Sequence, residues 1–205
     1  MRSVLLLPFL FSCSLFGIQD EEGPRYKVIE KSSDFEIREY ESYVVAKTTV
    51  QGDYDRSSSK AFRILAGYIF GKNKGEKKIA MTSPVEMKAE PKKIAMTAPV
   101  EMKTQGESLT MTFSMPSKYN INTLPEPLDK RIRFEKVPVK TVACYRFSGR
   151  TSQKTIQKMQ AKLKAWLKKR DNYQTIGEYS YAGYNPPWTL PFMRRNEVMV
   201  EIQPR

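Results

Sequence analysis

The chain has 205 residues and carries 35 Lys and Arg against 22 Asp and Glu, for a formal net charge of +13. This length suits a single domain with a hydrophobic core of its own. The positive charge favours contact with anionic lipids, anionic small molecules or nucleic acid, and does not choose among them. Most of the lysines are spaced singly along polar faces and no RNA- or DNA-binding motif occurs, so we expect no nucleic-acid partner.

The N-terminal segment is typical of an exported protein. Its apolar run, Val4–Phe11, is shorter than the ~20 residues that span a bilayer and suits a signal peptide. Leu10–Cys13 resembles a bacterial lipoprotein box, in which the cysteine is acylated and becomes the first residue. We therefore expect a signal peptide over residues 1–12, a lipidated Cys13 with a tether over residues 13–24, and a folded domain over residues 25–205. The protein would then be lipid-anchored at the bacterial cell envelope; the alternative is an ordinary signal peptide cleaved near Gly17, which gives a secreted or periplasmic protein.

The first half of the domain begins with short strands and continues with a helix. Strands are predicted over Tyr26–Lys31, Phe35–Tyr40 and Tyr43–Val50, where β-branched and aromatic residues are frequent. The apolar residues of Ser57–Phe70 recur at helical spacing, which predicts a buried helix. Either Asp53 or Asp55 can cap the N-terminus of this helix.

A string of twelve residues then occurs twice. Residues 77–88 read KKIAMTSPVEMK and residues 92–103 read KKIAMTAPVEMK. Apolar residues alternate with polar ones in both copies and again over residues 109–115, which predicts three neighbouring strands. Six methionines share one face of these strands: Met81, Met87, Met96, Met102, Met111 and Met115. Since thioethers are soft and adaptable, this face is either a flexible core or one wall of a pocket for a flat apolar ligand.

The second half repeats the order of strand, helix and strands. A connector over residues 116–127 leads to strands predicted over Arg131–Lys136 and Val139–Ser148. An amphipathic helix is predicted over Gln153–Arg170, capped by Thr151 or Ser152, and strands follow over residues 178–184 and 197–202. The fold class is therefore α+β, built from two pseudo-repeated halves. Cys144 has no disulfide partner if Cys13 is acylated, and we expect it to be a small structural residue.

Four strings of residues together resemble the SOUL haem-binding protein family. They occur in the family's order: the doubled Ile-Ala-Met-Thr-(Ser/Ala)-Pro-Val over 79–85 and 94–100, Phe-Ser-Met-Pro-Ser over 113–117, Arg-Phe-Ser-Gly over 146–149, and Tyr-Asn-Pro-Pro-Trp over 184–188 running on to Arg-Arg-Asn-Glu-Val over 194–198. The resemblance implies a distorted antiparallel β-barrel flanked by two helices. It also implies non-enzymatic binding of haem or a related tetrapyrrole, for storage, buffering, trafficking or sensing.

The chain departs from some members of that family because it contains no histidine. If the chain binds haem, the axial ligand of the iron must therefore be Met, Tyr, Cys or Lys, or the haem must be held in a hydrophobic clamp without a strong protein ligand. The alternative function is that the same fold binds another amphipathic ligand or an envelope protein partner, without haem.

Two groups of residues are candidates for ligand binding. Met81 and Met96 lie beside the proline bends of the doubled motif, although inward-facing methionines more often fill a core. In the second group, Tyr184, Trp188 and Phe192 offer flat apolar surfaces, and Arg194 and Arg195 could pair with the propionates of haem. The same residues could instead form a proline-stiffened loop that packs on the domain.

Enzymatic activity is not expected. The absence of histidine excludes serine– or cysteine–histidine pairs and histidine-bound zinc. The sequence contains no Gly-x-Ser-x-Gly elbow, and residues 71–77 lack the spacing of a phosphate-binding loop. Carboxylate-only chemistry stays open, but no acidic pair stands out at the strand ends.

Overall fold

One antiparallel sheet organises the part of the chain that the computed structural model describes, residues 22–75, 92–185 and 188–205. Within it, nine strands follow the order β1-β2-β9-β11-β10-β5-β6-β3-β8. A separate two-stranded ribbon pairs β4 with β7. The strands are β1 (Tyr26–Ser32), β2 (Phe35–Tyr40), β3 (Tyr43–Gln51), β4 (Asn73–Lys74), β5 (Val100–Gln105), β6 (Ser108–Ser114), β7 (Glu126–Pro127), β8 (Arg133–Val137), β9 (Lys140–Phe147), β10 (Tyr173–Gly183) and β11 (Asn196–Pro204).

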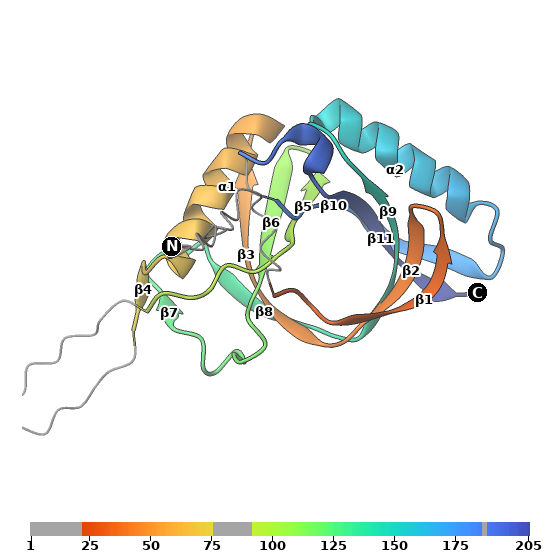
Figure 1. Ribbon diagram of the computed structural model, residues 1–205. Helices are drawn as coiled ribbons and strands as arrows, with labels where there is room; N and C mark the ends of the chain where they lie inside the picture. Colours follow the sequence, from red (N-terminus) through yellow and green to blue (C-terminus); the bar gives the residue numbers. More distant parts are fainter. Residues whose placement is uncertain (1–21, 76–91, 186–187) are drawn as a thin grey trace, which may run out of the picture.

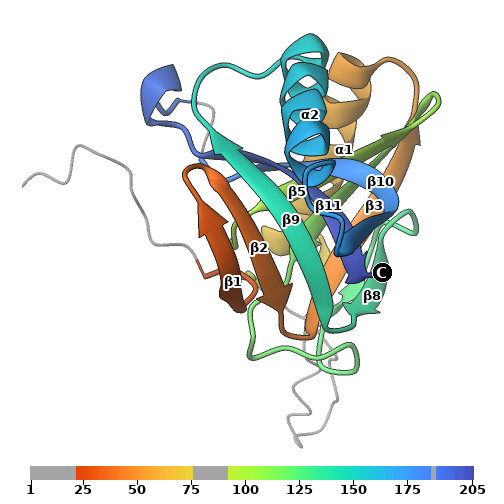
Figure 2. The same cartoon turned by 90° about the vertical axis from the view of Figure 1, so that its right-hand side faces the viewer.

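Two helices cover the outer side of this curved sheet (Figures 1 and 2). Helix α1 (Tyr54–Ile69) packs on β3 and β6, and α2 (Gln153–Leu167) packs on β9, β10 and β11. A short 3-10 helix, η1 (Pro191–Met193), interrupts the connection between β10 and β11. Among the described residues, neither helix combines the length and the hydropathy that crossing a bilayer requires.

The strand order confirms the two pseudo-repeated halves. In the first half, β3 leads into α1, the hairpin β5–β6 follows, and β6 pairs back with β3. In the second half, β9 leads into α2, the hairpin β10–β11 follows, and β11 pairs back with β9. The two halves join where β10 pairs with β5 in the middle of the sheet. The α+β class is thus confirmed.

The sheet is curved but is not closed. Its edge strands are β1, which pairs with β2, and β8, which pairs with β3, and no pairing joins the two edges within the described residues. Figure 1 shows the sheet curling around an inner side, along which the chain that leads into β1 runs. The closed barrel implied by the family resemblance is therefore not confirmed.

The second copy of the doubled motif is a strand over only part of its length. Residues 92–99 form no strand, and β5 begins at Val100. Pro99 has no N–H to donate to a neighbouring strand. The amide of Ile94 donates to the carbonyl of Ile69 at the end of α1 (2.8 Å) and not to a strand. The prediction of a strand over residues 92–103 is therefore wrong for its first part. The first copy, residues 77–88, with Met81 and Met87, lies outside the described residues.

The observed helices differ from the predicted ones at both ends of α1 and at the C-terminal end of α2. Helix α1 begins at Tyr54, before the predicted Ser57, because Asp53 caps it and accepts a hydrogen bond from the amide of Arg56 (3.0 Å). Helix α2 is capped by Ser152 as predicted but ends at Leu167. Beyond that end, Arg170 stacks on Trp166 and pairs with the carboxylate of Glu30.

A substitution at the cap of α1 tests this boundary. Asp53→Ala removes the acceptor of the Arg56 amide and should lower the free energy of unfolding by about 1 kcal/mol. Asp55 lies in the first turn without a cap contact of its own, so Asp55→Ala should cost less. Urea denaturation of both variants measures the difference. A larger loss for Asp55→Ala would contradict the assignment of the cap.

Candidate ligand-binding site

The inner side of the sheet carries its own cluster of side chains, away from the helices. Along β9, Ala143 belongs to the core under α2, whereas its neighbours Val142 and Cys144 point to the opposite face. There they pack with Tyr40 and Met199. Because side chains alternate along a strand, this inner cluster is fixed by the same register that builds the outer core.

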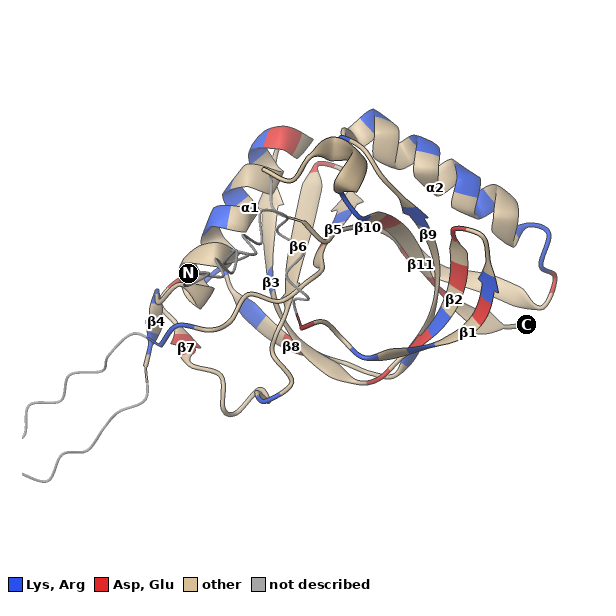
Figure 3. Ribbon diagram, viewed as in Figure 1, with Lys and Arg blue, Asp and Glu red and all other residues tan. Residues whose placement is uncertain are grey.

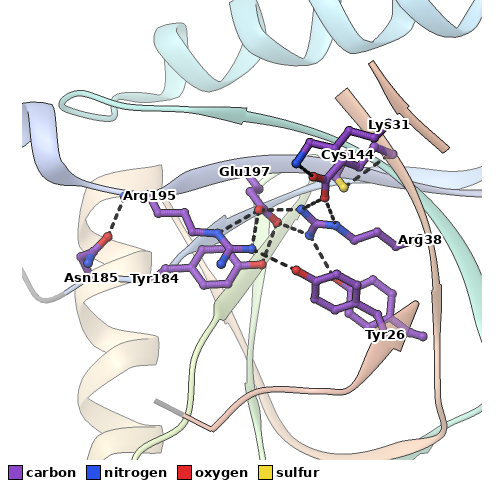
Figure 4. A network of polar contacts seen from close by, with 10 residues as sticks. Tyr26, Lys31, Arg38, Cys144, Tyr184, Asn185, Arg195 and Glu197 are labelled. Carbon is purple, nitrogen blue, oxygen red and sulfur yellow. Dashed lines mark hydrogen bonds and ion pairs between the residues drawn. The ribbon is translucent and has the colours of Figure 1, made fainter. Parts of the chain in front are cut away.

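A buried carboxylate, Glu197, lies at the centre of this inner side (Figure 4). Its side chain is 0% exposed. Arg38 donates to both of its oxygens, through Nη1 to Oε2 (2.7 Å) and Nη2 to Oε1 (2.9 Å). Arg195 donates to Oε1 through Nε (3.0 Å) and Nη2 (2.8 Å), and the hydroxyl of Tyr184 donates to Oε2 (2.7 Å). Both carboxylate oxygens are therefore fully hydrogen-bonded.

Aromatic and acidic side chains complete the surroundings of the two guanidinium groups. Arg38 also binds Glu36 through Nε (2.8 Å) and lies over the ring of Tyr26, with its Cζ 4.5 Å from the ring centroid. Arg195 lies over the ring of Tyr184, at 3.9 Å. The network joins β1, β2 and β11 with Tyr184, the residue that follows β10, so it fixes the inner walls relative to one another.

The electrostatics of the network favour its charged form. Burial alone would raise the pKa of Glu197, but the hydrogen bonds and charge of Arg38, with the charge of Arg195, outweigh it and hold the pKa below its usual value. Burial raises the pKa of Tyr184 well above its usual range, so this phenol stays neutral. Two guanidinium groups face one buried carboxylate here, and Glu36 is shared between Arg38 and Lys31. The five ionised groups together carry a surplus of one positive charge.

Cys144 lies beneath this network and is structural, as the sequence suggested. It is a free thiol, buried, with Sγ 3.5 Å from the carbonyl oxygen of Glu36. Burial raises the pKa of the thiol to about 12. A buried neutral thiol is neither a ready nucleophile nor a ready iron ligand.

Three adjoining pockets lie on the inner side of the sheet, and Pro24 forms part of the wall of each. We call them the Pro24 hollows. A hollow of about 180 Å³ has Tyr26, Tyr184 and Arg195 in its wall. A larger one, of about 630 Å³, lies where the turn between β2 and β3 meets the segment after β6, and a small one of about 30 Å³ lies over β9 and β11. Only the largest falls in the usual range for small-molecule sites, ≈300–1,000 Å³.

The residues just before β1 form the wall that the hollows share. The carbonyl of Glu22 accepts a hydrogen bond from the amide of Ala98 (3.1 Å), and its carboxylate accepts one from the amide of Ser117 (2.8 Å). Glu22, which the sequence places within a tether, is therefore hydrogen-bonded to the domain. The rest of the expected tether, with Cys13 and the signal peptide, lies outside the described residues.

The structure separates the candidate residues of the Tyr184–Arg195 segment onto two sides. Tyr184 and Arg195 face the Pro24 hollows. Trp188 and Phe192 lie on the outside of the molecule, 81% and 72% exposed. Arg194 is partly buried, and its Nε donates to the carbonyl of Thr189 (2.8 Å). The five residues therefore do not form one binding surface.

The described methionines of the repeat region belong mainly to the core. Met111 and Met115 are buried in the cluster beneath α1, and Met96 packs against that cluster, half-buried. Met102 lies between the cores of the two halves. Met115 is the member of this group that also lines a Pro24 hollow.

Sequence reasoning missed the residues at the centre of the inner side. Glu36, Arg38 and Tyr40 share one face of β2, and the two charged residues among them look like the solvent face of an edge strand. A signal was present in β11, where Glu197 directly precedes the apolar run Val198–Val200 in the part of the strand that is buried on both faces. A carboxylate in such a position needs a buried cation as its partner.

Comparisons with known proteins place this architecture in a family. Residues 21–201 match the family described as SOUL heme-binding protein. The chain belongs to this family. It is 32% identical over 188 residues to heme-binding protein 1 of Xenopus tropicalis, covering 90% of this chain and 93% of that protein. It is 31% identical over 185 residues to heme-binding protein 2 of Homo sapiens, covering 88% and 85% of the two chains.

Solved structures share the fold at low sequence identity. The C-terminal domain of EcmrR has a TM-score of 0.57 at 11% identity, covering 87% of this chain and 98% of that one. A protein from Listeria innocua described as a hydrolase has a TM-score of 0.53 at 10% identity, covering 85% and 94%. At such identities the likeness extends to the fold alone.

Removing the carboxylate of Glu197 tests the network. Glu197→Ala leaves Arg38 buried without its main partner and should lower the free energy of unfolding by roughly 3–5 kcal/mol. The matched control is Glu135→Ala, which breaks the exposed pair with Lys47 and should cost about 1 kcal/mol or less. Urea denaturation at neutral pH measures both. Similar losses in the two variants would show that the buried network is not the stronger contact.

The same carboxylate predicts a pH dependence. Because the pKa of Glu197 is lowered in the folded state, its stabilisation is complete above its unfolded-state pKa, about 4.3. It is lost as the pH falls through the lower folded-state pKa. The difference in unfolding free energy between the wild type and Glu197→Gln should therefore shrink in acid, which denaturation at a series of pH values measures. A difference that grows in acid would contradict the direction of the shift.

Proposed function

We propose that the chain binds haem or a related tetrapyrrole in the Pro24 hollows, without catalysing a reaction. The observation that carries this proposal is the position of the strings that relate the chain to the family. Three of the four contribute to the walls of these hollows: Ala98 and Pro99 from the second copy of the doubled motif, Met115, Pro116 and Ser117 from the Phe-Ser-Met-Pro-Ser string, and Tyr184 and Arg195 from the last string. The curated relatives named above are heme-binding proteins, which supports the same ligand class.

The shape and lining of the hollows suit a flat amphipathic ligand. The largest hollow, about 630 Å³, has Tyr43, Tyr119 and Met115 in its wall. It adjoins the smaller hollow, in which Tyr26, Tyr40 and Tyr184 gather. Phenol rings offer flat apolar surfaces with one polar end, which complements a macrocycle whose edge carries carboxylates.

Positive charges lie where the carboxylates of such a ligand would need partners. Arg25 and Lys136 line the largest hollow, although Glu22 and Glu41 line it too. Arg195 lines the adjoining hollow at the edge of a network with a surplus of one positive charge. Arginine and lysine both bind carboxylates, arginine with the more specific geometry. The propionate role expected for Arg194 and Arg195 together is thus proposed for Arg195, with Arg25 and Lys136.

The iron of a bound haem would have few ligands to choose from. The chain lacks histidine, and Cys144 is buried beneath the Glu197 network. Met115 lines the largest hollow and is a neutral ligand at any pH. Burial raises the pKa of Tyr43, which disfavours the phenolate that ferric iron prefers. We therefore propose Met115 as the ligand, or a clamp that holds the macrocycle without one.

The cellular setting is part of the proposal. A signal peptide over residues 1–12 and acylation of Cys13 would hold the domain at a bacterial envelope membrane, where binding would serve storage, buffering, trafficking or sensing of tetrapyrroles. Cells that express the wild type or Cys13→Ser are grown with an alkyne fatty acid, and the label on the protein is compared. The wild type should carry the label and Cys13→Ser should not. Label that persists in Cys13→Ser would rule out this site of attachment.

Titration with hemin tests the binding site. The full chain should form a saturable one-to-one complex, and Arg25→Gln with Lys136→Gln should weaken it by about tenfold or more, because charged hydrogen bonds to the propionates are lost. The affinity for the neutral diester of the same porphyrin should change little in this double variant, because the diester has no carboxylates to pair. The control is Arg56→Gln with Lys60→Gln on the exposed side of α1, which removes the same charge elsewhere. Equal losses in both pairs, or for both ligands, would contradict the propionate contacts.

The absorption spectrum tests the ligand to iron. Met115→Leu keeps the volume and the apolar character of the side chain and removes its sulfur. If Met115 binds the iron, the charge-transfer bands of the ferric complex should change while the stoichiometry stays the same. An unchanged spectrum would assign the site to a clamp without this ligand.

A further inference from the structure

The segment between β10 and β11 exposes a row of large apolar side chains that the proposed ligand site does not use. Trp188 is 81% exposed, Phe192 72% and Leu190 52%. They alternate along the segment and all three are exposed. Large apolar groups gathered at one exposed place indicate an interaction surface rather than ordinary surface composition.

Backbone contacts hold this segment in place. The amide of Gly149 donates to the carbonyl of Pro191 (2.9 Å), and the side chain of Asn196 donates to the carbonyl of Gly149 (3.2 Å). Within the segment, the amide of Met193 donates to the carbonyl of Leu190 (2.9 Å). The exposed side chains are therefore presented by a structured turn, which lies against the residues that lead into α2 (Figure 1).

The neighbouring helix supplies a strongly basic face. From Gly149 to Arg170 the sequence contains no Asp or Glu. Its exposed basic residues cover the side of α2 opposite its buried stripe (Figure 3). They are Arg150, Lys154, Lys158, Lys162, Lys164, Lys168 and Lys169. The segment from Tyr184 to Arg195 likewise contains arginine but no acidic residue.

We propose that Trp188, Leu190 and Phe192, together with the basic face of α2, form a surface that docks on an anionic lipid membrane. Trp and Phe partition into the interface between headgroups and acyl chains, and lysines nearby are attracted to anionic headgroups. The helix spreads its lysines over a length of roughly 22 Å without an acidic residue among them. A uniform array of one charge beside an apolar tip matches an extended anionic surface, whereas a protein interface mixes charges of both signs with polar pairs.

Vesicle binding of the full chain tests this proposal. The Cys13→Ser background removes the expected site of acylation, and residues 1–21 are otherwise present in every variant. Vesicles of equal parts phosphatidylserine and phosphatidylcholine are compared with vesicles of phosphatidylcholine alone, by co-sedimentation. The chain should bind the anionic vesicles more tightly, and added salt should weaken the binding.

Matched variants separate the two parts of the surface. Trp188→Ser with Phe192→Ser should weaken binding to anionic vesicles by about tenfold or more, because the double variant has less apolar surface to bury in the membrane. The control pair is Phe70→Ser with Leu128→Ser, which are 60% and 59% exposed elsewhere and should leave binding unchanged. Lys154→Gln with Lys158→Gln should reduce the preference for anionic vesicles, whereas Lys60→Gln with Arg63→Gln on α1 should not.

Tryptophan fluorescence gives a local readout. The protein has two tryptophans, and Trp166 is stacked on Phe35 with its ring centroid at 4.9 Å. Anionic vesicles with brominated acyl chains should therefore quench the emission of Trp188, and Trp188→Phe should remove most of this quenching. Equal affinity for neutral and anionic vesicles would overturn the proposal, and so would equal losses of affinity in the control pairs. An absence of quenching of Trp188 would also overturn it, because the contact with lipid would then lie elsewhere in the chain.

Discussion

The carboxylate of Glu197 accepts hydrogen bonds from Arg38, Arg195 and Tyr184, and these contacts hold together the inner side of the sheet. Bringing such an ion pair out of water is costly, so its presence is weak evidence for extra stability. Its value here is geometric. It ties β2 to β11, orients Arg195 and Tyr184 toward the same hollow, and keeps Cys144 covered. The inner walls of the Pro24 hollows are therefore built on one buried charge rather than on apolar packing alone.

The pseudo-repeated architecture explains why the hollows lie where they do. Both halves send their helix to the outer side, so that each has its apolar core there, and the two halves join through β5 and β10. The inner side then receives what neither helix covers, including polar and aromatic side chains. Strings that relate the chain to the SOUL family contribute residues to this side from both halves: Ala98, Pro99 and Met115 from the first, and Tyr184 and Arg195 from the second.

Much of the fold could be predicted from the sequence because it depends on local patterns. Helical spacing located α1 and α2, and the capping residues Asp53 and Ser152 were among the residues named for that role. Alternation failed over residues 92–99, because hydrogen bonds to the end of α1 and a proline override the strand pattern there. The site was harder to predict. Whether Arg38 faces solvent or Glu197 depends on pairing between β2, β9 and β11, which are far apart in the sequence, and alternation alone gives no such information.

The separation of Tyr184 and Arg195 from Trp188 and Phe192 makes the location of the ligand the central question. An NMR titration of the isotopically labelled chain with gallium protoporphyrin, a diamagnetic analogue of haem, answers it directly. The account predicts that the amide signals of Arg25, Tyr43, Ser117 and Tyr184 shift most, in step with one another and with saturation at one equivalent. Shifts confined to Trp188–Met193, or spread evenly over the lysines, would contradict a ligand in the Pro24 hollows.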